Sequence, residues 1–238
     1  MLFQDLFSFR TVTSEEVRRV IASLPLNDES PGPDNINSRI LKDCLLVILG
    51  SLTYIINCSI TFHTFHTAWK EAEVIPIVKD GDYEVASNNR PISLLAIASK
   101  VCEKIVLEQF SSHRISKNLL SPHQSGNKKH HSTETLNIFG TDTMLEAMGK
   151  KELVLLDISK AVNSINHHRL LHKLVNVGAS PATVQWFKDY LSDRFLSTRI
   201  NSTLSDLLPI THARSTPRCD AFTIIILYLL ERSSLRIS

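Results

Sequence analysis

Residues 155–171 read LLDISKAVNSINHHRLL, a stretch in which a predicted strand ends and a predicted helix follows. The apolar run that begins at Leu153 ends in a single carboxylate, Asp157, and a polar segment with histidines follows it. The run predicts a buried strand over residues 153–158, and apolar spacing predicts a helix from about Asn166 to Gly178. A carboxylate at the tip of a buried strand is a position where metal-dependent enzymes often hold a ligand.

The composition is that of a folded, mildly basic chain. Hydrophobic residues make up 43% of the 238 residues and charged residues 21%, a composition that permits a buried core and argues against wholesale disorder. A net charge of +2 does not by itself demand a nucleic-acid partner, although basic groups cluster in NKKHH and HHRLLHK.

Cysteine usage and apolar runs point to an intracellular protein. The four cysteines lie far apart without a C-x-x-C pair, which is typical of reduced thiols. The opening residues lack a signal-peptide pattern. The apolar runs CLLVILG and AFTIIILYLL are shorter than the ~20 residues of a membrane span, so we expect no membrane association and no secretion.

The remaining elements are predicted from capping signals and spacing. Thr13 to Leu24 predicts a capped helix, and residues 36–60 predict one long, largely buried helix. Residues 73–78 predict a strand, in which Pro76 favours an edge position or an end. Further predictions are a helix over 95–112 capped by Ser93, a helix starting at Ser132 or Thr133, a helix starting at Ser180-Pro181, and a strand over 195–200. Helices outnumber strands, which indicates an α/β or α+β protein.

Four sequence blocks occur in an order that is typical of one enzyme family. They are SPGPDNINSRILKDC (30–44), WKEAEVIPIVKDGDYEVASNNRPISLLAIASKVCEKIV (69–106), SPHQSGNKKHHSTETL (121–136), and LVLLDISKAVNSINHHRLLHKL (153–174) with WFKDYLSDR (186–194). Together they resemble the reverse transcriptase, an RNA-directed DNA polymerase, of non-LTR (LINE-type) retrotransposons. Four blocks in order are a far more specific signal than any one of them.

The resemblance implies a helix-rich right-hand polymerase fold, present as fingers plus partial palm. Residues 1–35 would precede the fingers, 36–150 would form a fingers-like region, and 151–213 a partial palm. The implied reaction is RNA-templated DNA synthesis, with an RNA template and a DNA primer as partners. Such nucleotidyl transfer uses two Mg²⁺ ions held by carboxylates.

The resemblance also assigns roles to individual residues. It implies that Asp157 is the first metal-binding and catalytic aspartate, and that Lys79 and Arg90 grip the incoming triphosphate. Lys128 and Lys129, in the basic loop of the third block, are candidates for contact with nucleic-acid phosphates. A solvated loop is an equally good interpretation of those two lysines.

Three departures from the family pattern argue against activity. The family's A-F-D is Ala161-Val162-Asn163 here, and valine is too small to pack against the nucleotide sugar. The family's G-F-R is Gly126-Asn127-Lys128, which replaces a forked guanidinium with a point charge. The 238 residues contain no paired-aspartate [FY]-x-D-D motif, and one carboxylate cannot hold two metals. We therefore expect an inactive fragment; the alternatives are a weak RNA- or DNA-binding remnant and a structural remnant with no activity.

The last block of the sequence departs from the family altogether. After LLPITH (207–212) the family continues G-V-P-Q-G, whereas this chain reads ARSTPRCDAFTIIILYLLERSS. Codons permitted for Arg214–Cys219 yield G-V-P-Q-G-V when they are read one base later. We therefore predict that residues 214–238 are an out-of-frame tail, and that no functional residue lies beyond His212.

Overall fold

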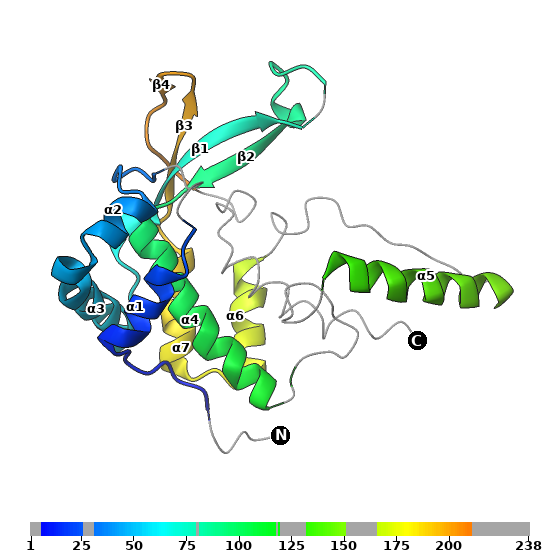
Figure 1. The fold of residues 1–238 in the computed structure, drawn as a ribbon, viewed down its shortest axis with the longest axis horizontal. Coiled ribbons are helices and arrows are strands. Elements are labelled where there is room, and N and C mark those ends of the chain that lie inside the picture. Colours follow the sequence, from blue (N-terminus) through cyan, green and yellow to red (C-terminus); the bar gives the residue numbers. More distant parts are fainter. Residues whose placement is uncertain are drawn as a thin grey trace.

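A computed structural model describes residues 6–25, 31–79, 81–117, 119, 132–150 and 166–210. Within these ranges the helices α1, α3, α4 and α7 gather into one bundle, and the strands β1–β4 extend from one end of it (Figure 1). The predicted strand over residues 153–158 and the tail from residue 214 lie outside the described residues.

The first helix is set by its cap. Helix α1 spans Ser14–Ala22 and shows the predicted capping box. The Glu16 N–H donates to the Thr13 side chain, and the Thr13 N–H donates to the Glu16 carboxylate at 2.9 Å. These bonds satisfy N–H groups that a helix N-terminus leaves without partners, so the prediction from Thr13 is confirmed.

The single helix predicted over residues 36–60 is two helices. Helix α2 spans Ser38–Asp43 behind the cap Asn37, and α3 spans Leu45–Phe62. Cys44, between them, has φ −88° and ψ 2°, which breaks the α-helical ladder. No sequence signal marks this break, since Cys44 is neither glycine nor proline.

Helix α3 is also less buried than predicted. One face packs into the core, while Leu46, Val47, Tyr54 and Phe62 are exposed. By length and composition alone, α3 is long and apolar enough to cross a membrane, although the apolar runs in the sequence are too short for a span. In the structure 33% of α3 is buried inside the protein. One face of α3 is buried, as in a core helix of a globular protein. The expectation that the protein does not associate with a membrane stays a prediction.

The later helices follow their predicted starts with one exception. Helix α4 spans Ile97–Ser116, but Ser93 does not cap it, because Ser93 lies in a strand. Helices α5 (Thr133–Lys150), α6 (His167–Asn176, capped by Asn166) and α7 (Pro181–Leu191, capped by Ser180) begin where predicted.

The sheet is mixed. Its strands are β1 (Glu71–Val78), β2 (Asn89–Leu94), β3 (Phe195–Ile200), β4 (Thr203–Leu204) and β5 (Leu208–Pro209), with short 3₁₀ turns at Thr67–Lys70 and Ala86–Asn88. β1 pairs antiparallel with β2 and parallel with β3, and β3 also pairs with β4 and β5. Both predicted strands among the described residues are therefore confirmed.

The proline in β1 sits where the sheet can accept it. Pro76 lies opposite Pro91 of β2, and β3 pairs only with residues 71–74 of β1. Pro76 is thus beyond the doubly paired part of the strand, where its missing N–H breaks no ladder bond to β3. β1 as a whole lies between β2 and β3, so of the two predicted positions, an edge or an end, the structure confirms the end.

The core lies between the helices. Phe65 and Trp69, just before β1, pack edge-on against each other, and Phe65 contacts Trp186 and Tyr190 of α7 in the same way. Fully or nearly fully buried side chains from α1, α3, α4 and α7 complete it: Val17, Val20, Ile21, Ile56, Ile60, Val101, Ile105, Phe110 and Phe187.

Candidate nucleotide-binding hairpin

The hairpin formed by β1 and β2 brings Lys79 and Arg90 together. Arg90 lies directly opposite Ile77, and the Lys79 N–H extends the ladder by donating to the Asn88 carbonyl at 2.8 Å. Residues opposite each other across an antiparallel pair share a face, as do residues two apart on one strand. Lys79 and Arg90 are therefore diagonal neighbours on one face of the hairpin.

Both cations are available to a ligand. Lys79 and Arg90 are exposed, and among the described residues neither takes part in an ion pair. Two like charges on one face of a hairpin repel each other, and an anion that bridges them offsets the repulsion. An ammonium and a guanidinium together suit a group with several phosphate oxygens.

The loop at the tip of the hairpin is held by its own side chains. Asn88 donates from Nδ2 to the Asp82 carbonyl at 3.0 Å, and Asn89 donates from Nδ2 to the Tyr83 carbonyl at 2.7 Å. Gly81 has a φ of +71°, and a Cβ there would lie 2.9 Å from the Asn88 side chain. A glycine is thus required at position 81, and the two asparagines fix the loop that separates the two cations in sequence.

An ion pair anchors the base of the hairpin to β3. Arg199 donates to both carboxylate oxygens of Glu73, with Nη2 2.6 Å from Oε2. Glu73 is 7% exposed, and its hydrogen bond with Arg199 holds the pKa of that carboxyl below its usual range. This pair joins the second sequence block to the strand that follows the fourth block. It therefore holds the base of the hairpin against β3.

Other residues of the sequence blocks serve as structural links between α7 and distant elements. The Lys70 ammonium lies 3.0 Å from the Asp189 carboxylate, which also accepts from the Phe65 N–H at 2.6 Å. Trp186 donates from Nε1 to the Ser59 hydroxyl at 3.0 Å. Sequence reasoning missed these links, because block membership shows that a residue matters without showing what it touches.

Tyr190 provides a direct test of such a link. Its hydroxyl lies 3.1 Å from the Glu103 carboxylate, and both side chains are buried. We expect Tyr190→Phe to lower the free energy of unfolding by about 1–3 kcal/mol, because the buried carboxylate loses a donor. Urea unfolding followed by circular dichroism measures this. Tyr83→Phe, on the exposed hairpin loop, is the matched control, and an equal loss in both variants would refute a specific role for Tyr190.

Three predicted site residues cannot be compared with this geometry. Asp157, Lys128 and Lys129 lie outside the described residues, so of the predicted set the structure brings together Lys79 and Arg90. Within the part of the chain that the structure describes, no group of three or more His, Cys, Asp or Glu residues is placed to hold a metal ion.

Comparison with known proteins identifies the class. The family model for reverse transcriptase (RNA-dependent DNA polymerase) matches residues 77–212, which include most of the hairpin and the strand that anchors it. The chain belongs to this family, and its mixed α/β architecture agrees with a fingers and palm fragment of such an enzyme.

Individual relatives narrow the group to non-LTR retrotransposons. The chain is 30% identical over 200 residues to the probable RNA-directed DNA polymerase from transposon BS of Drosophila melanogaster, covering 82% of the chain and 22% of that relative. It is 29% identical over 212 residues to the RNA-directed DNA polymerase from mobile element jockey of the same fly, covering 87% and 23%. The predicted resemblance is confirmed, and the chain spans less than a quarter of these relatives.

Proposed function

We propose that the chain is part of a non-LTR reverse transcriptase domain whose β1–β2 hairpin binds the triphosphate of an incoming deoxynucleotide. The observation that carries this proposal is the pairing of Lys79 and Arg90 on one exposed face. Lys79 supplies a mobile point charge, and Arg90 supplies a planar fork that can engage two phosphate oxygens. The Glu73–Arg199 pair at the base and the asparagine bonds at the tip hold that face in place before a ligand arrives.

The proposed ancestral reaction is transfer of a deoxynucleotide to a primer end on an RNA template. The family implies dependence on a divalent metal in general, and we propose Mg²⁺, with Asp157 as one ligand. When bound, such ions activate the primer hydroxyl and neutralise charge on the triphosphate. Lys79 and Arg90 would orient the triphosphate and hold its charge from the other side.

The proposed partners are an RNA template and a DNA primer inside the cell. Lys128 and Lys129 would contact their phosphates, a role that rests on the sequence block alone. Such contacts weaken as salt rises, because counterions compete for the phosphates. The second candidate function is binding of RNA or DNA without catalysis. The lysines of the basic loop and the two cations of the hairpin support it.

We further propose that the 238-residue chain does not catalyse polymerisation by itself. Three sequence features support this: Val162 in place of the family's phenylalanine, Asn163 in place of its aspartate, and no paired aspartates among these residues. Binding of nucleotide and loss of chemistry are separate properties, because they depend on different residues.

Nucleotide binding tests the role of the hairpin. We expect Lys79→Ala and Arg90→Ala each to weaken binding of a fluorescent deoxynucleoside triphosphate about tenfold or more, since each removes a charge-assisted contact worth ~1.5–3 kcal/mol. Fluorescence anisotropy at fixed ionic strength measures this. Lys188→Ala, which removes an exposed cation on α7, is the control. Equal weakening of nucleotide binding in all three variants would mean that binding depends on net charge and not on the hairpin.

A further inference from the structure

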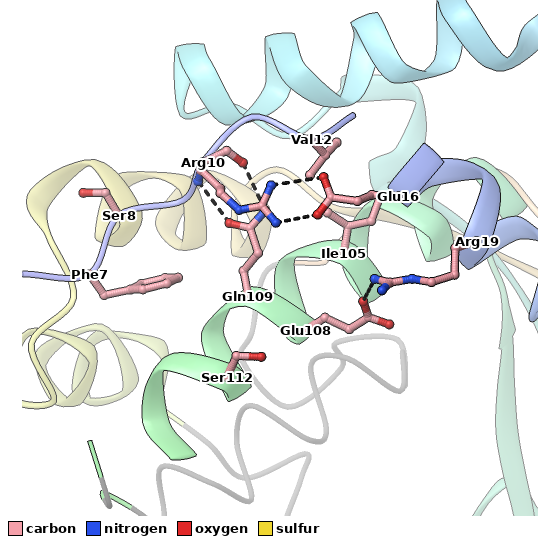
Figure 2. A pocket seen from close by; sticks show the side chains of 10 residues that line it. All are labelled: Phe7, Ser8, Arg10, Val12, Glu16, Arg19, Ile105, Glu108, Gln109 and Ser112. Atoms are coloured by element: carbon pink, nitrogen blue, oxygen red, sulfur yellow. Dashed lines mark hydrogen bonds and ion pairs between the residues drawn. The ribbon is translucent and has the colours of Figure 1, made fainter. Parts of the chain in front are cut away.

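Residues 6–13 form an extended segment that crosses the helices before α1 begins, and we call it the N-terminal strap. It precedes the residues that the family model matches. A groove of about 370 Å³ runs alongside it, bordered by strap residues and by α1 and α4 (Figure 2). Its lining includes Phe7, Arg10, Val12, Glu16, Gln109 and Ser112.

The start of the strap is bonded to the corner between α6 and α7. The Phe7 N–H donates to the Gly178 carbonyl at 2.8 Å, and the Ser180 N–H donates to the Phe7 carbonyl at 2.8 Å. The hydroxyl of Thr183 donates to the same Phe7 carbonyl at 3.1 Å. Gly178 has a φ of +88°, a conformation that glycine adopts without strain. Phe7 of the strap therefore pairs with Ala179 of this corner as an isolated parallel β-bridge.

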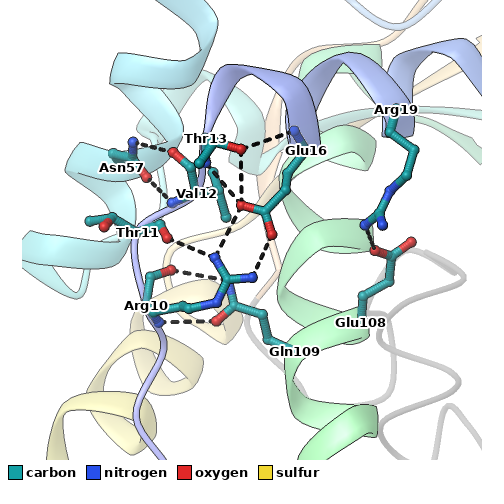
Figure 3. Close-up of polar contacts among 9 residues, drawn as sticks. All are labelled: Arg10, Thr11, Val12, Thr13, Glu16, Arg19, Asn57, Glu108 and Gln109. Carbon is teal, nitrogen blue, oxygen red and sulfur yellow. Dashed lines mark hydrogen bonds and ion pairs between the residues drawn. The ribbon is translucent and has the colours of Figure 1, made fainter.

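Two carboxamide side chains hold the middle of the strap (Figure 3). Arg10 donates from its N–H to Gln109 Oε1 at 3.0 Å, and Gln109 donates from Nε2 back to the Arg10 carbonyl at 3.0 Å. Val12 is bonded in the same way by Asn57 of α3, at 2.7 and 2.9 Å. A carboxamide presents a donor beside an acceptor, as a peptide edge does, so each side chain takes the place of a neighbouring strand.

The end of the strap is fixed to α1. Arg10 forms a forked ion pair with Glu16, and the Thr13 N–H donates to the same carboxylate (Figure 3). The hydrogen bond from Arg10, followed by that from Thr13, lowers the pKa of Glu16 to about 2. The pair is therefore charged at neutral pH, and the strap stays aligned with the helix that follows it.

Aromatic packing adds a second mode of attachment. Phe7 lies 5.5 Å from Phe110 of α4, and Phe9 lies 5.5 Å from Trp186 of α7, measured between ring centroids. The strap thus contacts α1, α3, α4, α7 and the corner before α7. The four helices α1, α3, α4 and α7 come from different parts of the sequence.

We propose that the N-terminal strap is a conformational lock that couples the α6–α7 corner to α4, with Asn57 of α3 as a fixed second attachment point. Gln109 is the central positioning residue, because it fixes the strap midway between the corner and α1. Releasing Gln109 removes both bonds to the Arg10 backbone, while the Arg10 side chain stays paired with Glu16. The weakened strap then loosens the corner, which Gln109 itself does not touch. Helix α7 stays docked through Trp186 and Tyr190, so the motion is confined to the corner and the end of α6.

Hydrogen exchange of the full chain tests this coupling. In Gln109→Leu we expect the amides of Gly178 and Ala179 to exchange about tenfold faster or more, although both donate within their own corner, to Val175 and Leu174. Amides inside α3 should exchange at the wild-type rate. Ser112→Ala, one turn further along α4 beside the same groove, is the control and should change neither set.

Two outcomes would overturn the proposal. One is faster exchange throughout all helices, which would show general destabilisation instead of coupling. The other is unchanged exchange at Gly178 and Ala179. If Gln109→Leu does not fold, the same comparison is made in Gln109→Glu, which keeps an acceptor for the Arg10 N–H and loses the donor to the Arg10 carbonyl. Faster exchange confined to the strap and the corner supports the lock in that variant also.

Discussion

The purified 238-residue chain will not extend a primer on an RNA template with either Mg²⁺ or Mn²⁺. Transfer of a nucleotide by two metals needs several carboxylates to hold them, and removing ligands removes the charge stabilisation on which the reaction depends. In the proposed assignment, Asp157 is the one metal-binding aspartate among the 238 residues. Val162 and Asn163 alter the same block further.

The measurement is incorporation of labelled deoxynucleotide on a primed RNA over several hours. Asp157→Ala is the reference, because it removes the remaining candidate ligand and keeps Lys79 and Arg90. Extension by the wild-type chain above the level of Asp157→Ala would show that the site is functional, and the inactive assignment would then be wrong.

A second strong prediction concerns the reading frame of the last 25 residues, 214–238. Arg214 to Cys219 can be encoded AGG AGT ACC CCA AGG TGT. Read one base later, these bases give GGA GTA CCC CAA GGT GT, which encodes G-V-P-Q-G-V. The five residues Asp220–Ile224, as GAT GCT TTC ACC ATT, continue in the shifted frame as M-L-S-P and then Leu or Phe.

The agreement extends further along the tail. The family pattern after this point is P-L-L-F-x-x-Y-I-N-D. Ile224–Ile226 as ATT ATT ATT, followed by a leucine codon that begins with C, read TTA TTA TTC in the shifted frame, which is L-L-F. Permitted codons for Leu229–Ser233 likewise give Y-L-N-D. Permitted codons are thus compatible with a displaced family block over this stretch, and on that basis we predict that the apolar run AFTIIILYLL is a product of the frame.

Sequencing the locus decides the matter at single codons. We expect Ser215 to be encoded by AGT, Thr216 by ACC and Pro217 by CCA, since these are required for V, P and Q in the next frame. A TCN codon at Ser215 would contradict the displaced frame, because its second base cannot begin a valine codon. The prediction that no functional residue lies beyond His212 would then lose its basis.

Local chemistry explains which parts of the fold the sequence could predict. The start of α1 depends on Thr13 and Glu16, and those of α6 and α7 depend on Asn166 and Ser180, so each is readable from neighbouring residues. Ser93 has the same capping chemistry, yet it lies in β2 opposite Val74. Strand pairing with a distant segment outweighed the local preference there, and no nearby residue signals that.

The candidate site shows the same division. The sequence blocks pointed to Lys79 and Arg90, but their common face follows from the register that places Arg90 opposite Ile77. The bond from Trp186 to Ser59 joins residues 127 positions apart, and that separation leaves no periodic signal in the sequence. Spacing predicts elements, whereas contacts between elements had to come from the structure.

The most direct test of the account is a titration of the wild-type chain with deoxynucleoside triphosphate in the presence of inorganic tripolyphosphate. The central claim is that the hairpin binds the triphosphate through Lys79 and Arg90 independently of chemistry. We predict that tripolyphosphate displaces the nucleotide fully, and that a deoxynucleoside without phosphates does not displace it. Displacement by the deoxynucleoside, with none by tripolyphosphate, would contradict the claim.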